Sequence, residues 1–325
     1  MKRALLIGIN KYPGNELKGC VEDIEQVNAA IKKNEDGSPN FDVMMMPDVQ
    51  TSAEVMENVI RLFSGDGEAA LLYFSGHGFV NDTGAEIVMP QDLVTQGQYY
   101  MGIQMRTIMD IVNDSKVRNK IVILDCCHSG NIGKYKLEDS SSHLQSGVSI
   151  LTACRDDETA EEIGGHGVFT ELLCAALNGG AADYCGNITI GGVYSYIDRS
   201  LGAWQQRPVF KTNVTEFVPL KKVEPQVPLS TIRELTNLFS NPTEVLALDP
   251  SFEDTNDPAI VHKYIEPYAK KENVVKFKNL QILQSIGFVK PVDAPFMYFA
   301  AIESKGCMLT EIGRYYWRLV KDGRI

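Results

Sequence analysis

Residues 121–130 read Ile-Val-Ile-Leu-Asp-Cys-Cys-His-Ser-Gly, an apolar run that stops abruptly at reactive side chains. Residues 71–78, Leu-Leu-Tyr-Phe-Ser-Gly-His-Gly, follow the same pattern. Runs of this kind are typical of buried parallel strands. In open α/β sheets, functional side chains collect at the carboxyl ends of the strands. We therefore expect the two strands to bring a cysteine, Cys127, and a histidine, His77, to one edge of a sheet.

Alternating strand and helix patterns surround these two runs. Strands are expected over residues 4–9, 42–46, 69–74, 120–124, 148–152 and 208–212. Helices are expected over residues 20–33, 52–63, 104–113, 169–178 and 190–201. Alternation of this kind predicts an α/β fold, with a mostly parallel six-stranded sheet covered by helices on both faces.

The pattern changes after residue 219. Prolines at 219, 225 and 228 predict a linker over residues 220–228, between a first domain at 1–219 and a second at 229–325. Beyond the linker, helices are expected over residues 231–239, 259–271, 274–286 and 309–320, with a short hairpin near 287–291. This order favours a small, mainly helical, winged-helix-like domain.

The composition is that of a globular protein, with 44% hydrophobic and 22% charged residues. No apolar stretch reaches transmembrane length, and the apolar run at residues 4–9 is followed by no cleavage site. The seven cysteines are an odd number without a disulfide or zinc spacing. A cytoplasmic protein with reduced thiols and no membrane association is therefore expected.

The net charge of −11 is concentrated in the first 225 residues, because the remainder has 12 basic and 12 acidic side chains. An acidic domain is a poor partner for nucleic acid and a suitable one for cationic substrates.

The two opening motifs, Asp125–Gly130 and Tyr73–Gly78, resemble the catalytic motifs of metacaspases and bacterial caspase-like cysteine peptidases. Further segments match the family in the right order, so the resemblance covers roughly residues 1–219 and implies a caspase-like α/β/α sandwich. These segments are residues 4–12, 17–23, 151–160, 167–170 and 206–208.

The resemblance implies a catalytic dyad in which Cys127 is the nucleophile and His77 transfers the proton. The family places the nucleophile immediately before His-Ser-Gly, which selects Cys127 over Cys126, and His128 is expected only to shape the turn. The backbone N–H groups of Gly78 and Cys127 are candidates for the oxyanion site. The glycines around His77 are expected to let the backbone approach a substrate and adopt positive φ. No third catalytic residue is evident.

The resemblance also implies a primary specificity pocket formed by Cys20, Asp23, Ser75 and Asp125. Two carboxylates around one slot would bind arginine or lysine and repel aspartate. The expected activity is therefore that of a cysteine endopeptidase that cleaves protein or peptide substrates after a basic residue.

No cofactor is expected. Many metacaspases require calcium, but here Asp92 is retained while residues 98–102 and 130–134 contain no carboxylate, and this set is too poor for the six to eight oxygen ligands that calcium prefers. Lys134 and Lys136 lie in a polar stretch where such a peptidase could cut itself, and an uncut loop is an equally good interpretation.

The second domain is expected to dock an activating partner or bind a small signal molecule, in a regulated bacterial effector of defence or stress responses. Two other readings remain open. One is a catalytically silent caspase-like scaffold, and the other is a DNA-binding regulator acting through the second domain, although that domain lacks a basic stripe.

Overall fold

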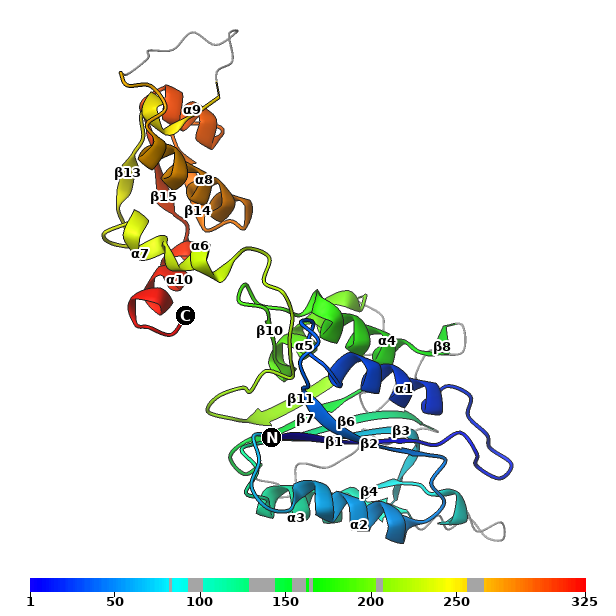
Figure 1. The fold of residues 1–325 in the computed structure, drawn as a ribbon. Helices are drawn as coiled ribbons and strands as arrows, with labels where there is room; N and C mark the ends of the chain where they lie inside the picture. Colours follow the sequence, from blue (N-terminus) through cyan, green and yellow to red (C-terminus); the bar gives the residue numbers. More distant parts are fainter. Residues whose placement is uncertain are drawn as a thin grey trace. The chain divides into compact units, whose positions relative to one another are not determined.

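A computed structural model describes residues 1–81, 84–92, 102–128, 144–153, 162–163, 166–202, 207–255 and 266–325. The chain forms two compact units, Met1–Glu224 and Pro225–Ile325 (Figure 1). Each unit has its own core and is described separately.

The first unit is built on a six-stranded sheet of order β11-β7-β6-β3-β1-β2. All neighbouring strands are parallel except β11 and β7. This confirms the mostly parallel sheet expected from the sequence. The strands are β1 (Lys2–Gly8), β2 (Phe41–Pro47), β3 (Ala69–Asn81), β6 (Asn119–His128), β7 (Val148–Thr152) and β11 (Val209–Asn213).

Short strands extend this unit beyond the six. β3 runs past the parallel sheet and pairs antiparallel with β4 (Gly84–Ile87), which pairs with β5 (Ile103–Gln104). Two further antiparallel pairs are β8 (Glu162–Ile163) with β9 (His166–Gly167), and β10 (Asn187–Ile188) with β12 (Lys221–Lys222). A single turn of 3₁₀ helix, η1 (Pro90–Asp92), follows β4.

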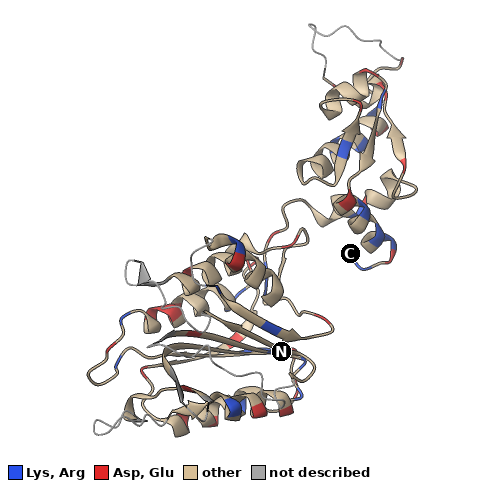
Figure 2. Ribbon diagram, turned by 180° about the vertical axis from the view of Figure 1, so that it is seen from behind, with Lys and Arg blue, Asp and Glu red and all other residues tan. Residues whose placement is uncertain are grey.

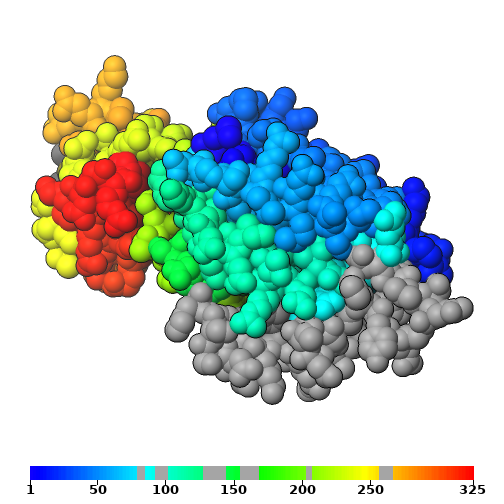
Figure 3. Space-filling model, turned by 90° about the horizontal axis from the view of Figure 1, so that it is seen from below, coloured from blue at the N-terminus to red at the C-terminus, as the bar shows by residue number. Residues whose placement is uncertain are grey.

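Helices cover both faces of the sheet (Figure 1). α1 (Cys20–Ile31), α4 (Val168–Ala175) and α5 (Ile190–Ser200) pack on one face. α2 (Ser52–Phe63) and α3 (Met105–Asp114) pack on the other, and they form much of the surface seen in Figure 3. Each face buries its own apolar core, since successive side chains of a strand point to opposite sides.

One helix differs from the sequence expectation of residues 169–178. α4 ends at Ala175, and a π-helical turn, η3 (Ala176–Gly180), follows it. Gly179 has φ +122°, a conformation that a side chain would disfavour, so the chain leaves the helix there.

The expected linker also contributes to the first unit. Lys221–Lys222 pair with Asn187–Ile188, and Leu220 is buried, so the division between the units falls between Glu224 and Pro225.

The second unit combines helices with a three-stranded antiparallel sheet of order β13-β15-β14. Its elements are α6 (Leu229–Arg233), α7 (Leu235–Leu238), β13 (Val245–Ala247), η4 (Pro250–Phe252), α8 (Lys271–Ser285), β14 (Val289–Val292), α9 (Met297–Ile302), β15 (Gly306–Leu309) and α10 (Glu311–Lys321). Basic residues are coloured blue towards the end of α10 in the ribbon of Figure 2, where Arg318 and Lys321 occupy the last turn.

This second unit is not clearly a winged helix. The hairpin expected near residues 287–291 is replaced by β14 and β15 with α9 between them, and the strand β13 was not anticipated. The helix expected over 259–271 is wrong for residues 266–270, which are not helical, because Pro267 lacks the N–H that a helix interior requires. Residues 259–265 lie outside the described part of the chain.

Among the described residues, no helix has both the length and the apolar character needed to cross a membrane.

Replacing Gly8 by alanine is expected to destabilise the first unit by about 3 kcal/mol. A Cβ at Gly8 would lie 2.1 Å from the carbonyl oxygen of Cys20, so α1 would have to move off β1. Urea unfolding of the wild type and the variant measures the difference. In the control Gly191→Ala, the new Cβ meets only the Phe217 ring at 3.4 Å, and we expect a change of less than about 1 kcal/mol. Equal stabilities of the two variants would contradict this account of the β1–α1 packing.

Candidate active site

The two sequence motifs meet at the carboxyl edge of the sheet. β3 and β6 are parallel neighbours, and their register pairs His77 with Cys127 and Ser75 with Asp125. Paired residues on adjacent strands lie only about 5 Å apart. The fold therefore brings the expected nucleophile and its proton-transfer partner to neighbouring backbone positions. This pair lies two residues further along each strand than Ser75 and Asp125, two of the expected pocket residues.

The His77 ring is held by a backbone carbonyl. Its Nε2 lies 2.8 Å from the oxygen of Asn15, in the loop between β1 and α1. Because a carbonyl only accepts hydrogen bonds, Nε2 carries the proton in this contact. In the neutral ring, Nδ1 then has the free lone pair and is the nitrogen that can accept a proton.

The Asn15 carbonyl is a functional group that sequence reasoning missed. Every residue has a carbonyl oxygen, so no residue type marks it. The one available signal is that the segment between Asn10 and Lys18 follows β1, which ends at the same carboxyl edge as β3.

The glycines flanking His77 differ from expectation. Neither Gly76 nor Gly78 has a positive φ. The space beside Gly76 is filled by the protein itself, since a Cβ there would lie 2.5 Å from the hydroxyl oxygen of Tyr12. The expectation that Gly76 admits substrate is therefore wrong: this glycine makes room for a tyrosine.

The four expected pocket residues lie close together, on β3, β6 and α1, next to the paired positions His77 and Cys127. Ser75 Oγ donates a hydrogen bond of 2.8 Å to Asp23 Oδ2, which joins β3 to α1. Asp23 and Asp125 are only 4% and 3% exposed. Cys20, one helical turn before Asp23, is also buried.

Asp125 is oriented by a chain of hydroxyl groups that sequence reasoning did not assign. Thr170 Oγ1, on α4, donates a hydrogen bond of 2.6 Å to Asp125 Oδ2. The Tyr73 hydroxyl lies 2.6 Å from the same Thr170 oxygen. Because the Thr170 proton is directed at Asp125, Tyr73 must donate to Thr170. In the sequence, the contribution of Thr170 could have been suspected only because it belongs to the segment 167–170, which matches the family.

Burial dominates the electrostatics of this cluster. It raises the pKa of Asp125 to about 7; the Thr170 hydrogen bond opposes this rise and the nearby Asp23 charge adds to it. Burial also raises the pKa of the Cys20 thiol to about 12. Cys20 is therefore a neutral thiol at ordinary pH and a poor nucleophile.

Several other predicted residues can be placed only in part. The backbones of Gly78 and Cys127 lie within β3 and β6, and His128 is the last residue of β6. Cys126 is buried in the core on the α2–α3 side, as expected for a residue that alternates with Asp125. Asp92 ends η1, and Lys134 and Lys136 lie outside the described residues.

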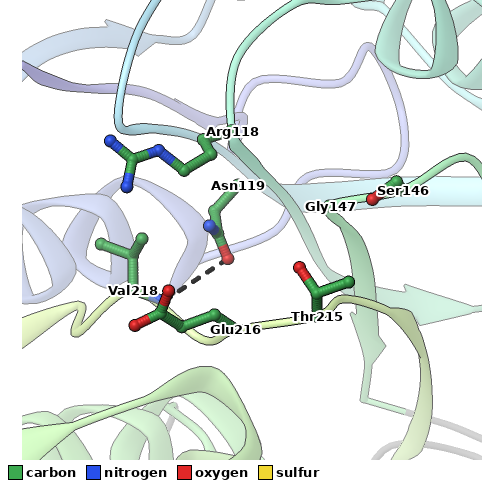
Figure 4. A pocket seen from close by; sticks show the side chains of 7 residues that line it. All are labelled: Arg118, Asn119, Ser146, Gly147, Thr215, Glu216 and Val218. Atoms are coloured by element: carbon green, nitrogen blue, oxygen red, sulfur yellow. Dashed lines mark hydrogen bonds between the residues drawn. The ribbon is translucent and has the colours of Figure 1, made fainter. Parts of the chain in front are cut away.

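A small pocket of about 100 Å³ lies at the opposite end of β6 (Figure 4). Arg118, Asn119 and Glu216 are among its lining residues, and Asn119 Oδ1 accepts a hydrogen bond of 3.5 Å from the Val218 N–H. It is at the amino end of the strand, and neither His77 nor Cys127 is among its lining residues. In the part of the chain that the structure describes, no group of three or more His, Cys, Asp or Glu residues could hold a metal ion.

Comparison with known proteins identifies the family. The caspase domain family matches residues 1–219, and the chain therefore belongs to it. The crystal structure of protein GSU0716 from Geobacter sulfurreducens is similar, with a TM-score of 0.51 and 19% identity over 69% of this chain and 99% of that one. A likeness at this identity shows the fold. No match to a curated protein was found.

The raised pKa of Asp125 predicts a stability effect with a definite sign. The folded protein holds this proton more tightly than the unfolded chain, whose aspartates titrate near 3.9. The stability that the proton supplies is present below about pH 4 and is lost as pH rises to about 7.

We therefore expect the unfolding free energy of the wild type, relative to that of Asp125→Asn, to fall between pH 5 and 7. The slope is at most about 1.4 kcal/mol per pH unit, and the difference becomes constant above about pH 8. Urea unfolding at each pH measures it, and the comparison removes the titration of all other groups. A difference that rises with pH would contradict the burial assigned to this carboxyl.

Proposed function

We propose that this protein is a cysteine endopeptidase that cleaves its substrates after arginine or lysine, with Cys127 and His77 as a catalytic dyad. The observation that carries the proposal is the pair of buried carboxylates, Asp23 and Asp125, directly behind the two motif residues. Membership in the caspase family supports the peptidase chemistry, and the carboxylates support the basic specificity.

A cationic side chain fits this cluster for an electrostatic reason. Among the described residues, no lysine or arginine forms an ion pair with Asp125, and its charge is costly to bury. A substrate guanidinium would supply the missing positive charge and could bind a carboxylate through two parallel hydrogen bonds. An aspartate in the same place would add a further carboxylate to this acidic cluster, so caspase-type cleavage after aspartate is disfavoured.

The proposed acylation step uses the tautomer of His77. Nδ1 accepts the proton of the Cys127 thiol, and the thiolate attacks the scissile carbonyl, whose π electrons move onto oxygen. The backbone N–H groups of Gly78 and Cys127 are proposed to stabilise this oxyanion. The C–N bond then breaks, and the imidazolium gives its proton to the leaving amine.

Deacylation reverses the roles. His77 accepts a proton from water as the water attacks the thioester, and the C–S bond breaks to release the carboxylic acid and regenerate the thiol. The Asn15 carbonyl stays bonded to Nε2–H throughout and stabilises the imidazolium whenever it forms.

The second unit is proposed to regulate the peptidase by docking a partner or binding a small signal molecule. Its strand order, with α8 before the β14–β15 pair, is compatible with a winged-helix-like derivation. DNA binding is less favoured, because the unit is electrically neutral and Lys278 of α8 is paired with Asp254 at 2.9 Å. A role in defence or stress responses is proposed from the family resemblance. Self-cleavage at Lys134 or Lys136 is proposed from the lysines of the polar stretch 131–146, and independence of calcium from the scarcity of carboxylates near Asp92 and after Cys127.

Fluorogenic peptides that end in Arg, Lys or Asp test the proposal when assayed with the wild type and with Cys127→Ala. We expect cleavage after Arg and Lys, none after Asp, and loss of activity in the variant. Faster cleavage after Asp would overturn the specificity. An inactive wild type that also fails to react with an arginyl chloromethyl ketone would favour the scaffold reading.

The pH dependence provides a separate prediction. Because a guanidinium binds the ionised form of Asp125, kcat/KM for an arginine substrate should rise as pH increases through about 7 in the wild type. Asp125→Asn should lower kcat/KM by about 100-fold and remove this dependence. Asp110→Asn, an exposed carboxyl on α3, is the matched control and should behave as the wild type. An unchanged profile in Asp125→Asn would contradict the assignment of Asp125 to substrate binding.

A further inference from the structure

The loop between β1 and α1 places the side chain of Tyr12 between the end of β3, at His77, and Val88, the residue after β4. Tyr12 is fully buried, and its hydroxyl oxygen lies 3.0 Å from the backbone nitrogen of His77. The same hydroxyl donates a hydrogen bond of 3.1 Å to the carbonyl oxygen of Val88. Tyr12 therefore bridges the end of β3 to the residue that follows β4.

This bridge interrupts the strand pairing at one position. The β3–β4 register pairs Gly78 with Ile87, so the next pair is His77 with Val88. The Val88 N–H donates directly to the His77 carbonyl at 3.0 Å. In an antiparallel pair of this kind the His77 N–H would return the bond to Val88. Here the Tyr12 hydroxyl stands between the two groups and accepts from one while it donates to the other.

The same loop also holds the imidazole ring. The Tyr12 ring lies against it, with centroids 4.5 Å apart and planes inclined by 56°. The Asn15 carbonyl, three residues further on, binds Nε2. The loop is itself fixed, because the Asn15 N–H donates to the Tyr12 carbonyl at 3.0 Å and Asp48 accepts from the Lys11 N–H at 3.1 Å.

Gly76 gives an independent sign that the tyrosine belongs there. A Cβ at this position would lie 2.5 Å from the Tyr12 hydroxyl and 2.8 Å from the Phe74 ring. Only glycine leaves room for the hydroxyl to reach the His77 backbone. Burial raises the pKa of Tyr12 far above its ordinary value, so the hydroxyl keeps its proton and its donor role at every pH of interest.

We propose that Tyr12 is a positioning residue for the catalytic histidine: its hydroxyl sets the backbone of His77 and its ring sets the imidazole plane. This inference rests on the proposed function, in which His77 transfers the proton. The Tyr12 hydroxyl bonds the backbone of His77 and Val88 and its ring contacts the imidazole, so the proposed effect of Tyr12 on the reaction is exerted through His77.

The variant Tyr12→Phe tests the hydroxyl while keeping the ring. It leaves the His77 N–H and the Val88 carbonyl without their bridge, so the two strands must close up or the groups remain unsatisfied. Either response shifts the imidazole from the position that the register provides. We expect kcat for an arginine substrate to fall about 10- to 100-fold with little change in KM, because misplacement affects the proton transfer and not the binding of the substrate side chain.

Tyr73→Phe is the matched control. Tyr73 is an equally buried tyrosine whose hydroxyl supports Thr170 and Asp125. Its loss should raise KM for arginine substrates more than it lowers kcat. Titration of active sites with an irreversible thiol reagent corrects both variants for any unfolded fraction. If kcat of Tyr12→Phe per active site equals that of the wild type, or if both variants show the same KM effect, the proposal is overturned.

A second measurement does not depend on turnover. ¹⁵N NMR of the histidine-labelled protein reports the tautomer of His77, which His77→Ala assigns among the five histidines. We expect the Nε2–H tautomer in the wild type and a mixture of tautomers in Tyr12→Phe. Identical spectra would overturn the role of Tyr12 even in an inactive protein. An active His77→Ala variant would instead refute the proposed function, so the two failures are distinguishable.

Discussion

The parallel register between β3 and β6 is the constraint on which the site depends. It sets His77 beside Cys127 and Ser75 beside Asp125. A slip by one residue would turn each side chain of a strand to the opposite face of the sheet, and a slip by two would separate His77 from Cys127 by about 7 Å along the strand. Apolar packing prevents both, because Tyr73 on β3 and its neighbours are buried against helices on either face. The apolar core thus fixes the relative positions of the residues at the carboxyl edge of the sheet.

The acidic cluster opposes the stability that this core supplies. Two carboxylates and a thiol lie in one buried region, and hydroxyl groups of Ser75 and Thr170 supply hydrogen bonds but no positive charge. Asp125 accordingly retains its proton up to a pH near 7 in the free protein. In the proposed function, a cationic substrate would offset this cost when it binds. The electrostatic cost of burying these carboxylates and the proposed preference for a basic residue therefore have the same origin.

The strands of the sheet, and the two motifs at their ends, can be recognised from the sequence because each is marked by a short continuous run of residues. β-branched runs identify β6, and the helical pattern over residues 52–63 matches the bounds of α2. What the sequence could not predict is carried by the backbone or by single long-range contacts. The Asn15 carbonyl has no side-chain signature, and the Tyr12 hydroxyl reaches Val88 across 76 positions of sequence. In the second unit, the three-residue strand β13 is too short to show an alternating pattern.

Covalent labelling tests the central claim most directly, since it requires a nucleophile, its base and the acidic cluster at once. The wild type is treated with a peptidyl arginyl acyloxymethyl ketone and, in parallel, with the matching aspartyl reagent, and the adducts are mapped by mass spectrometry. The account predicts a single adduct on Cys127 from the arginyl reagent, much slower in Asp125→Asn and in His77→Ala. An adduct on another cysteine, or faster labelling by the aspartyl reagent, would contradict it.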